Sequence, residues 1–108
     1  MSNAAAEIVD RYFNAQNTDD IAALSACFAD DATVLDEGGT IVGPERIGAW
    51  MAEARRKYGQ VAEPLETSER DGATIVKARV TGNFPGSPAV LEHAFRLAGG
   101  RIVSLEIR

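Results

Sequence analysis

The sequence predicts an α+β fold in which helices pack on one face of a curved, mainly antiparallel sheet. Three observations predict this class. Apolar residues recur at helical spacing through most of the first 60 residues, and from Val61 onward they alternate with polar residues as in half-buried strands. Short turn signals separate these later strands, which favours antiparallel hairpins.

The first two helices are predicted from the spacing of their apolar residues. The earlier helix covers residues 5–16 and presents one apolar face: Ile8, Val9, Tyr12 and Phe13. Residues 17–20 interrupt this pattern, and Thr18 is the expected N-cap of a second helix. Its apolar residues again repeat at three and four positions: Ile21, Leu24 and Phe28. Residues 29–31 are expected to end this helix, so the two helices form a hairpin.

A short strand and a third helix come next. Residues 32–36 read as a strand that ends at Asp36 and enters a turn at Gly38 and Gly39. Pro44 suits the first turn of a helix, and Gly59 is expected to end that helix. The apolar stripe between them consists of Ile47, Trp50, Met51, Ala54 and Tyr58.

Four strands are expected to complete the chain, over residues 61–70, 73–82, 89–98 and 101–107. The first of them is polar on both faces, which predicts a strand at the sheet edge or in a partly exposed position. In the third, the residues of one face are Leu91, His93, Phe95 and Leu97. The only histidine of the chain therefore points with apolar residues.

Length and composition limit the possible functions. The 108 residues are 45% hydrophobic and 25% charged, which fits one globular domain over residues 1–108. A net charge of −5 disfavours binding to nucleic acid or to an anionic membrane. Cys27 and His93 are the only cysteine and histidine, so no zinc-binding cluster is expected. The lack of a long apolar run and of a secretory signal predicts a cytoplasmic protein.

The order of these elements, together with several motifs, resembles the NTF2-like superfamily, and more narrowly its SnoaL-like and ketosteroid-isomerase-like branch. The motifs are the run FADDATVLD over residues 28–36, the helix start GPERI over residues 43–47, and the segments 82–88 and 95–103. The resemblance covers nearly the whole chain. It implies a cone-shaped pocket and a homodimer formed through the outer face of the sheet. Isomerases, cyclases, hydrolases, dehydratases and binding proteins all use this fold, so the chemistry depends on the site.

The resemblance also implies candidate catalytic residues. In ketosteroid isomerase an aspartate is the base, and a tyrosine with a protonated aspartic acid forms the oxyanion hole. Tyr12 falls at the tyrosine position and Asp36 at the base position, whereas His93 stands where the protonated aspartic acid would be. The residues expected to line the pocket are Phe13, Trp50, Met51, Phe84 and Phe95.

Each candidate also has a structural interpretation. Asp36 could cap the glycine turn, and Tyr12 could simply pack in the core. His93 could donate a hydrogen bond to a ligand carbonyl, pair with Asp36, or be a hydrogen-bonded core histidine. Trp50 and Met51 also fit an ordinary core stripe.

The expected function is cofactor-independent acid/base catalysis on a small hydrophobic carbonyl compound, of the isomerase, aldol cyclase or dehydratase type. Asp36 would move a proton beside the carbonyl, while Tyr12 and His93 hold the developing oxyanion. The alternative is a non-catalytic domain that binds a hydrophobic small molecule or serves dimerisation. No metal, cofactor, nucleic acid or membrane is expected as a partner.

Overall fold

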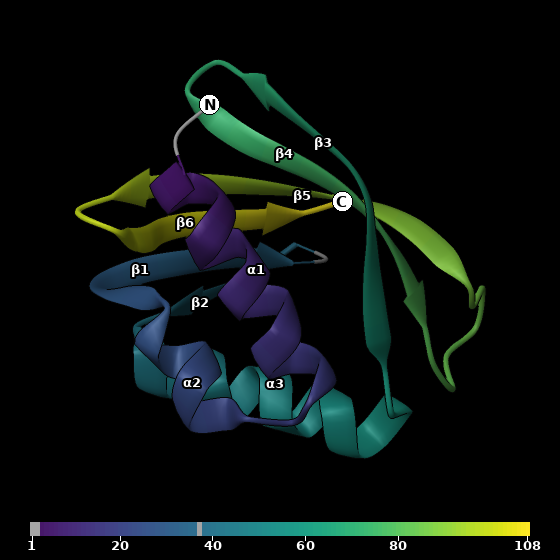
Figure 1. Cartoon of the computed structure of the whole chain (residues 1–108). Helices are drawn as coiled ribbons and strands as arrows, with labels where there is room; N and C mark the ends of the chain where they lie inside the picture. Colours follow the sequence, from purple (N-terminus) through teal and green to yellow (C-terminus); the bar gives the residue numbers. More distant parts are fainter. Residues whose placement is uncertain (1–2, 37) are drawn as a thin grey trace.

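The computed structural model describes residues 3–36 and 38–108, and within them three helices cover one face of a six-stranded sheet (Figure 1). The helices are α1 (Asn3–Asn17), α2 (Ile21–Ala26) and α3 (Pro44–Tyr58). The strands are β1 (Phe28–Asp36), β2 (Gly39–Val42), β3 (Val61–Arg70), β4 (Ala73–Thr81), β5 (Ala89–Ala98) and β6 (Arg101–Ile107). The predicted α+β class is confirmed.

The sheet brings distant parts of the chain side by side. Its strand order is β2-β1-β6-β5-β4-β3, and every pair is antiparallel except β1 with β6. Ile107 in β6 is in register with Asp36 on one side and with His93 on the other. Residues opposite each other on neighbouring strands point to the same face, so all three side chains share one face of the sheet.

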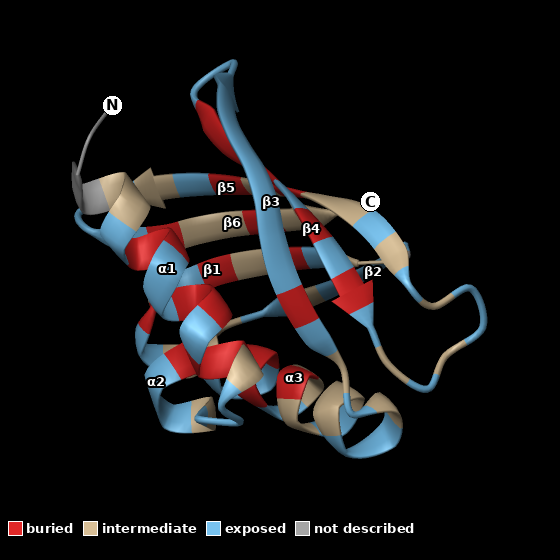
Figure 2. Ribbon diagram, turned by 45° about the vertical axis from the view of Figure 1, so that its right-hand side comes forward, coloured by how far each residue is buried: buried red, intermediate tan, exposed pale blue. Residues whose placement is uncertain are grey.

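Helices α1 and α3 provide the cover for that face. Buried segments recur along α1 and α3, as the red parts of the ribbon in Figure 2 show. Helix α3 begins at Pro44, as predicted, and ends before Gly59, whose backbone has φ 59°. Only glycine adopts this left-handed conformation without steric cost, so the predicted helix end is confirmed.

The predicted start of the second helix is wrong. The N-cap of α2 is Asp20, whose Oδ1 accepts a hydrogen bond from the backbone N–H of Ala23 at 3.1 Å. The Thr18 hydroxyl instead donates to the carbonyl oxygen of Asn14 at 2.8 Å, at the end of α1. Both Thr18 and Asp20 have side chains that suit an N-cap, and the loop conformation decides between them.

The predicted end of that helix is also wrong. Phe28 and residues 29–31 belong to β1, so the strand begins four residues earlier than expected. Phe28 continues the helical spacing of Leu24, but the parallel pairing of β1 with β6 begins there, where Phe28 is in register with Ile102. Strand β2 was not predicted at all. It is four residues long and holds its place by pairing with β1.

The remaining strands follow the prediction closely, and β3 is an edge strand as expected. One side chain attaches it to the helical layer. Asn17 Nδ2 donates to the carbonyl oxygen of Ala62 at 2.7 Å, and the Ala62 N–H donates to Asn17 Oδ1 at 2.9 Å. This double hydrogen bond fixes the C-terminal end of α1 against the start of β3.

Candidate functional site

A pocket of about 580 Å³ lies between the helices and the inner face of the sheet. This volume is within the range of sites that bind small organic molecules. The residues that line it are Tyr12, Gln16, Asp36, Trp50, Met51, Glu53, Ala54, Lys57, Tyr58, Gln60, Val80, Phe84, Pro85, Leu91, His93 and Ile107. The three candidate catalytic residues and Trp50, Met51 and Phe84 therefore meet at one pocket.

Phe13 and Phe95 do not line the pocket, contrary to expectation, although both are buried. Their rings instead support the polar candidates. Phe95 packs edge-on against the Tyr12 ring at 5.3 Å between centroids and stacks on the His93 ring at 6.2 Å. Phe13 contacts the same two rings, at 5.1 and 5.3 Å. These two phenylalanines hold the rings of Tyr12 and His93 in place, because each packs against both.

The Tyr12 hydroxyl is the most unusual group of the site. Tyr12 is fully buried, and among the described residues its hydroxyl has no hydrogen-bond partner. Buried tyrosine hydroxyls normally find one, so an unpaired hydroxyl requires an explanation. Burial raises the pKa of Tyr12, and the nearby Asp36 carboxylate raises it further. The hydroxyl therefore keeps its proton and is available as a hydrogen-bond donor.

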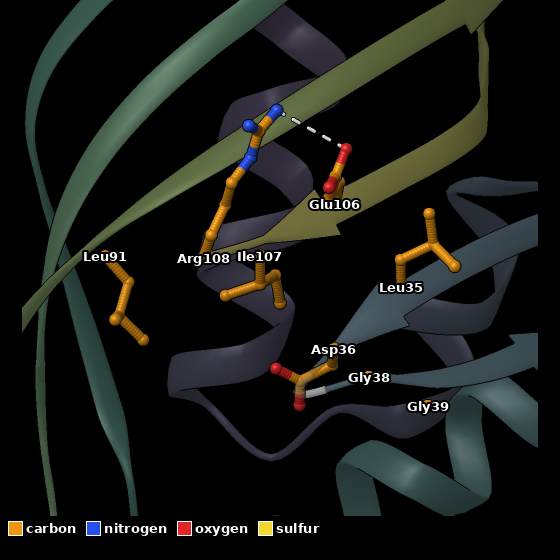
Figure 3. A pocket seen from close by; sticks show the side chains of 8 residues that line it. All are labelled: Leu35, Asp36, Gly38, Gly39, Leu91, Glu106, Ile107 and Arg108. Atoms are coloured by element: carbon orange, nitrogen blue, oxygen red, sulfur yellow. Dashed lines mark hydrogen bonds and ion pairs between the residues drawn. The ribbon is translucent and has the colours of Figure 1, made fainter.

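Asp36 is the last residue of β1 and lies where two hollows meet. Figure 3 shows its carboxylate on the same side of the sheet as Ile107 and Leu91, while Leu35, Glu106 and Arg108 point to the other side. Asp36, Leu91 and Ile107 line both the inner pocket and a second hollow of about 480 Å³ next to it. Asp36 thus stands between the inner pocket and the surface.

His93 is buried and neutral at physiological pH. Its Nδ1 lies 3.3 Å from the carbonyl oxygen of Leu91. Burial lowers the pKa of His93 to about 4, although backbone hydrogen bonds with Leu91 and Val76 oppose the shift. A carbonyl oxygen only accepts, so this hydrogen bond places the proton of the neutral ring on Nδ1.

His93 and Asp36 share the pocket wall and stand two strands apart. Ile107 lies between them in the register, which separates their backbones by two strand spacings, or about 10 Å. The hydrogen bond of the His93 ring goes to the Leu91 carbonyl. The structure thus shows His93 as a hydrogen-bonded residue of the pocket wall.

Sequence reasoning missed the polar residues that α1, α3 and the loop after α3 add to the pocket: Gln16, Glu53, Lys57, Tyr58 and Gln60. Gln16 is the most buried of them, at 3% exposure. Its position four residues after Tyr12 was a usable signal, because residues at this spacing share one helix face. The described residues contain no cluster of three or more metal-binding side chains. None of their helices has the length and apolarity needed to cross a membrane.

The fold and the pocket define the class of protein: an NTF2-like domain with a ligand-sized hollow between its helices and its sheet. Residues 9–105 match the SnoaL-like domain, and the chain belongs to this family. The predicted superfamily and branch are thereby confirmed.

Solved structures agree with this assignment. A candidate polyketide cyclase from Sinorhizobium meliloti is 43% identical, with a TM-score of 0.90 and coverage of 94% of both chains. A protein from Catenulispora acidiphila with a ketosteroid isomerase-like fold, in complex with trimethylamine, is 24% identical, with a TM-score of 0.83 over 94% of this chain and 84% of that chain. An epoxide hydrolase of M. tuberculosis is 16% identical, with a TM-score of 0.82 over 98% and 82%. The last two show the fold alone. No curated protein matches the chain.

Proposed function

We propose that the protein is a cofactor-independent acid/base enzyme that acts on a small hydrophobic carbonyl compound. The observation that carries this proposal is the unpartnered Tyr12 hydroxyl, in the same pocket as the Asp36 carboxylate. A donor that the protein leaves unused, close to a carboxylate base, is the combination that enolate formation requires.

In the proposed reaction, the carbonyl oxygen of the ligand accepts a hydrogen bond from the Tyr12 hydroxyl. Asp36 takes a proton from the carbon next to the carbonyl. The electron pair of that C–H bond forms the C=C bond of an enolate, and the carbonyl π electrons move to the oxygen. Tyr12 stabilises this oxyanion. An isomerase returns the proton to another carbon, whereas in an aldol cyclase the enolate carbon attacks a second carbonyl.

The protonation states support these roles. The raised pKa of Tyr12 keeps it a neutral donor, so it stabilises the oxyanion without giving up its proton. The lowered pKa of His93 keeps its ring uncharged above about pH 4. With its one proton donated from Nδ1 to the Leu91 carbonyl oxygen, the neutral ring offers only an acceptor at Nε2, so His93 is part of the pocket wall and Tyr12 is the donor to the oxyanion.

The aldol cyclase form of the reaction has additional support from one relative. The Sinorhizobium meliloti protein of 43% identity is named as a candidate polyketide cyclase. The apolar part of the pocket wall, which includes Trp50, Met51, Phe84 and Val80, suits the carbon skeleton of such a compound.

The experiment that tests the proposal measures proton abstraction directly. The bicyclic ketone 1-tetralone is incubated with the protein in D₂O, and replacement of its hydrogens next to the carbonyl by deuterium is followed by NMR. We expect the protein to accelerate this exchange. Asp36→Asn should slow it about 100-fold, because a positioned general base contributes at least this much. Asp31→Asn, the same change at an exposed position of β1, is the matched control.

Two outcomes would contradict the proposal. Exchange that is equally fast with Asp36→Asn would remove Asp36 as the base. Binding of 1-tetralone without any accelerated exchange would favour the alternative, a domain that binds a hydrophobic small molecule without catalysis.

A further inference from the structure

Gln16 is a second polar group that the protein leaves unpaired in the pocket. It is 3% exposed, and its Oε1 has no hydrogen-bond partner among the described residues. Among these residues, the buried side-chain oxygen and nitrogen atoms without a partner are Gln16 Oε1 and the Tyr12 hydroxyl. A buried polar atom without a partner destabilises the protein, so two of them in one pocket point to ligand groups that pair with them.

The two groups come from the same rigid element. Tyr12 and Gln16 are four residues apart on α1, so both side chains leave the same face of the helix. The backbone at Gln16 is held independently of its side chain, because Arg55 Nη1 donates to the Gln16 carbonyl oxygen at 3.1 Å and to the Gln60 carbonyl oxygen at 3.0 Å. The carboxamide itself is therefore not needed to fix the end of α1.

We propose that Gln16 is a specificity-determining residue that hydrogen-bonds a hydroxyl group on the carbonyl ligand. This inference rests on the proposed function, in which Tyr12 binds the carbonyl oxygen of the same ligand. A ligand that carries a carbonyl and a separate hydroxyl pairs with both buried groups at once, whereas a plain ketone leaves Gln16 unpaired.

The chemistry of the surroundings selects a neutral hydroxyl over a charged group. The Oε1 atom is an acceptor, and a hydroxyl is the common neutral donor on small carbonyl compounds. A carboxylate or phosphate on the ligand would share the pocket with the Asp36 side chain, which disfavours a second negative charge. The ligand class is thus a hydroxylated ketone.

Binding of matched ketones tests this inference. The probes are 1-tetralone and its 5-, 6- and 7-hydroxy derivatives, and dissociation constants are measured by calorimetry. Fluorescence of Trp50, the only tryptophan, reports whether each probe occupies the pocket. We expect at least one hydroxy derivative to bind about tenfold more tightly than 1-tetralone, the factor that corresponds to pairing one buried polar group.

Variants assign this preference to the side chain. Gln16→Leu should lose the tenfold preference and bind 1-tetralone at least as tightly as the wild type. Tyr12→Phe should weaken all the probes to a similar degree, because each has the carbonyl. Asn14→Leu makes the same kind of change at an exposed position of α1 and should keep the preference. The ratio of two dissociation constants is insensitive to a general loss of stability.

The outcomes separate the two proposals. If 1-tetralone binds and depends on Tyr12, but no hydroxy derivative is preferred or Gln16→Leu retains the preference, the inference about Gln16 is wrong and the carbonyl site stands. If none of the probes quenches Trp50 or releases heat at millimolar concentration, the carbonyl ligand class is wrong, and both proposals fall.

Discussion

His93 gives the pocket a defined response to pH. Its pKa is about 6.5 in an unfolded chain and about 4 in the folded protein, mainly because of burial. Between these pH values the unfolded state binds more protons than the folded state. The contribution of His93 to the free energy of unfolding is therefore highest above pH 6.5 and falls by about 3 kcal/mol as the pH drops to 4.

Urea unfolding at several pH values from 7 to 4 tests this prediction. His93→Phe should lose less stability than the wild type over this interval, because it has no imidazole to protonate and the carboxylates common to both proteins cancel in the difference. A wild type and a variant with parallel pH profiles would contradict the prediction. NMR titration of the single imidazole should give a midpoint near 4, and Asp36→Asn should shift it little, since Ile107 separates the two residues.

Single residues also show how far the sequence predicts the site. Placing Tyr12, Asp36 and His93 at one pocket required only the resemblance and the face of each element, because helical and strand periodicity determine which side chains point inward. The separation of Asp36 from His93 depends on β6 inserting between β1 and β5, which no local pattern encodes. The unpaired atoms of Tyr12 and Gln16 depend on what packs around them, so they too could not be predicted.

At the level of secondary-structure elements, the attachment of α1 to β3 is the contact that we expect to matter most. Strand β3 is an edge strand with a largely exposed surface, and Asn17 makes two hydrogen bonds to the backbone of Ala62. Asn17→Ala would leave a partly buried N–H and carbonyl unpaired. We expect the free energy of unfolding to fall by about 2 kcal/mol.

Equilibrium denaturation measures this loss, and hydrogen exchange locates it. The N–H of Ala62 should exchange much faster in Asn17→Ala than in the wild type. The exchange rates of amides in the central strands should rise only as far as the lower free energy of unfolding requires. Asn14→Ala, at an exposed position of the same helix, is the matched control. A loss below about 0.5 kcal/mol would show that β3 is held by its pairing with β4 alone.

Element boundaries were predicted well wherever a residue with special backbone geometry marks them. Pro44 and Gly59 delimit α3 correctly, since each restricts the conformations available at its position. The junction between α2 and β1 was misplaced because Leu24 and Phe28 have a helical spacing, and only pairing with β6 makes Phe28 part of a strand. Likewise, β2 is too short to show alternation and forms by pairing with β1.

For the whole molecule, the two faces of the sheet have different roles. The inner face meets the helices and forms the pocket. One row of register partners across β1, β6 and β5, here called the inner rung, consists of Asp36, Ile107 and His93. The outer rung beside it runs through Leu35, Glu106, Ala94 and Ile75. The outer rung belongs to the face that the resemblance assigns to a homodimer. This assembly stays a prediction, and the exposed apolar residue on that rung allows it to be tested.

We predict a homodimer in solution, with Leu35 at its interface. Leu35 is 42% exposed on the outer face, an arrangement that exposes apolar surface to water unless a second copy covers it. Light scattering should give twice the chain mass of 11.5 kDa at micromolar concentration. Leu35→Glu should give the mass of one chain, because it would bury two carboxylates at a symmetric contact. Leu65→Glu, at a similarly exposed position of edge strand β3, should remain dimeric. A wild type with the mass of one chain would contradict the homodimer. A Leu35→Glu variant that stays dimeric would show that the interface does not include Leu35.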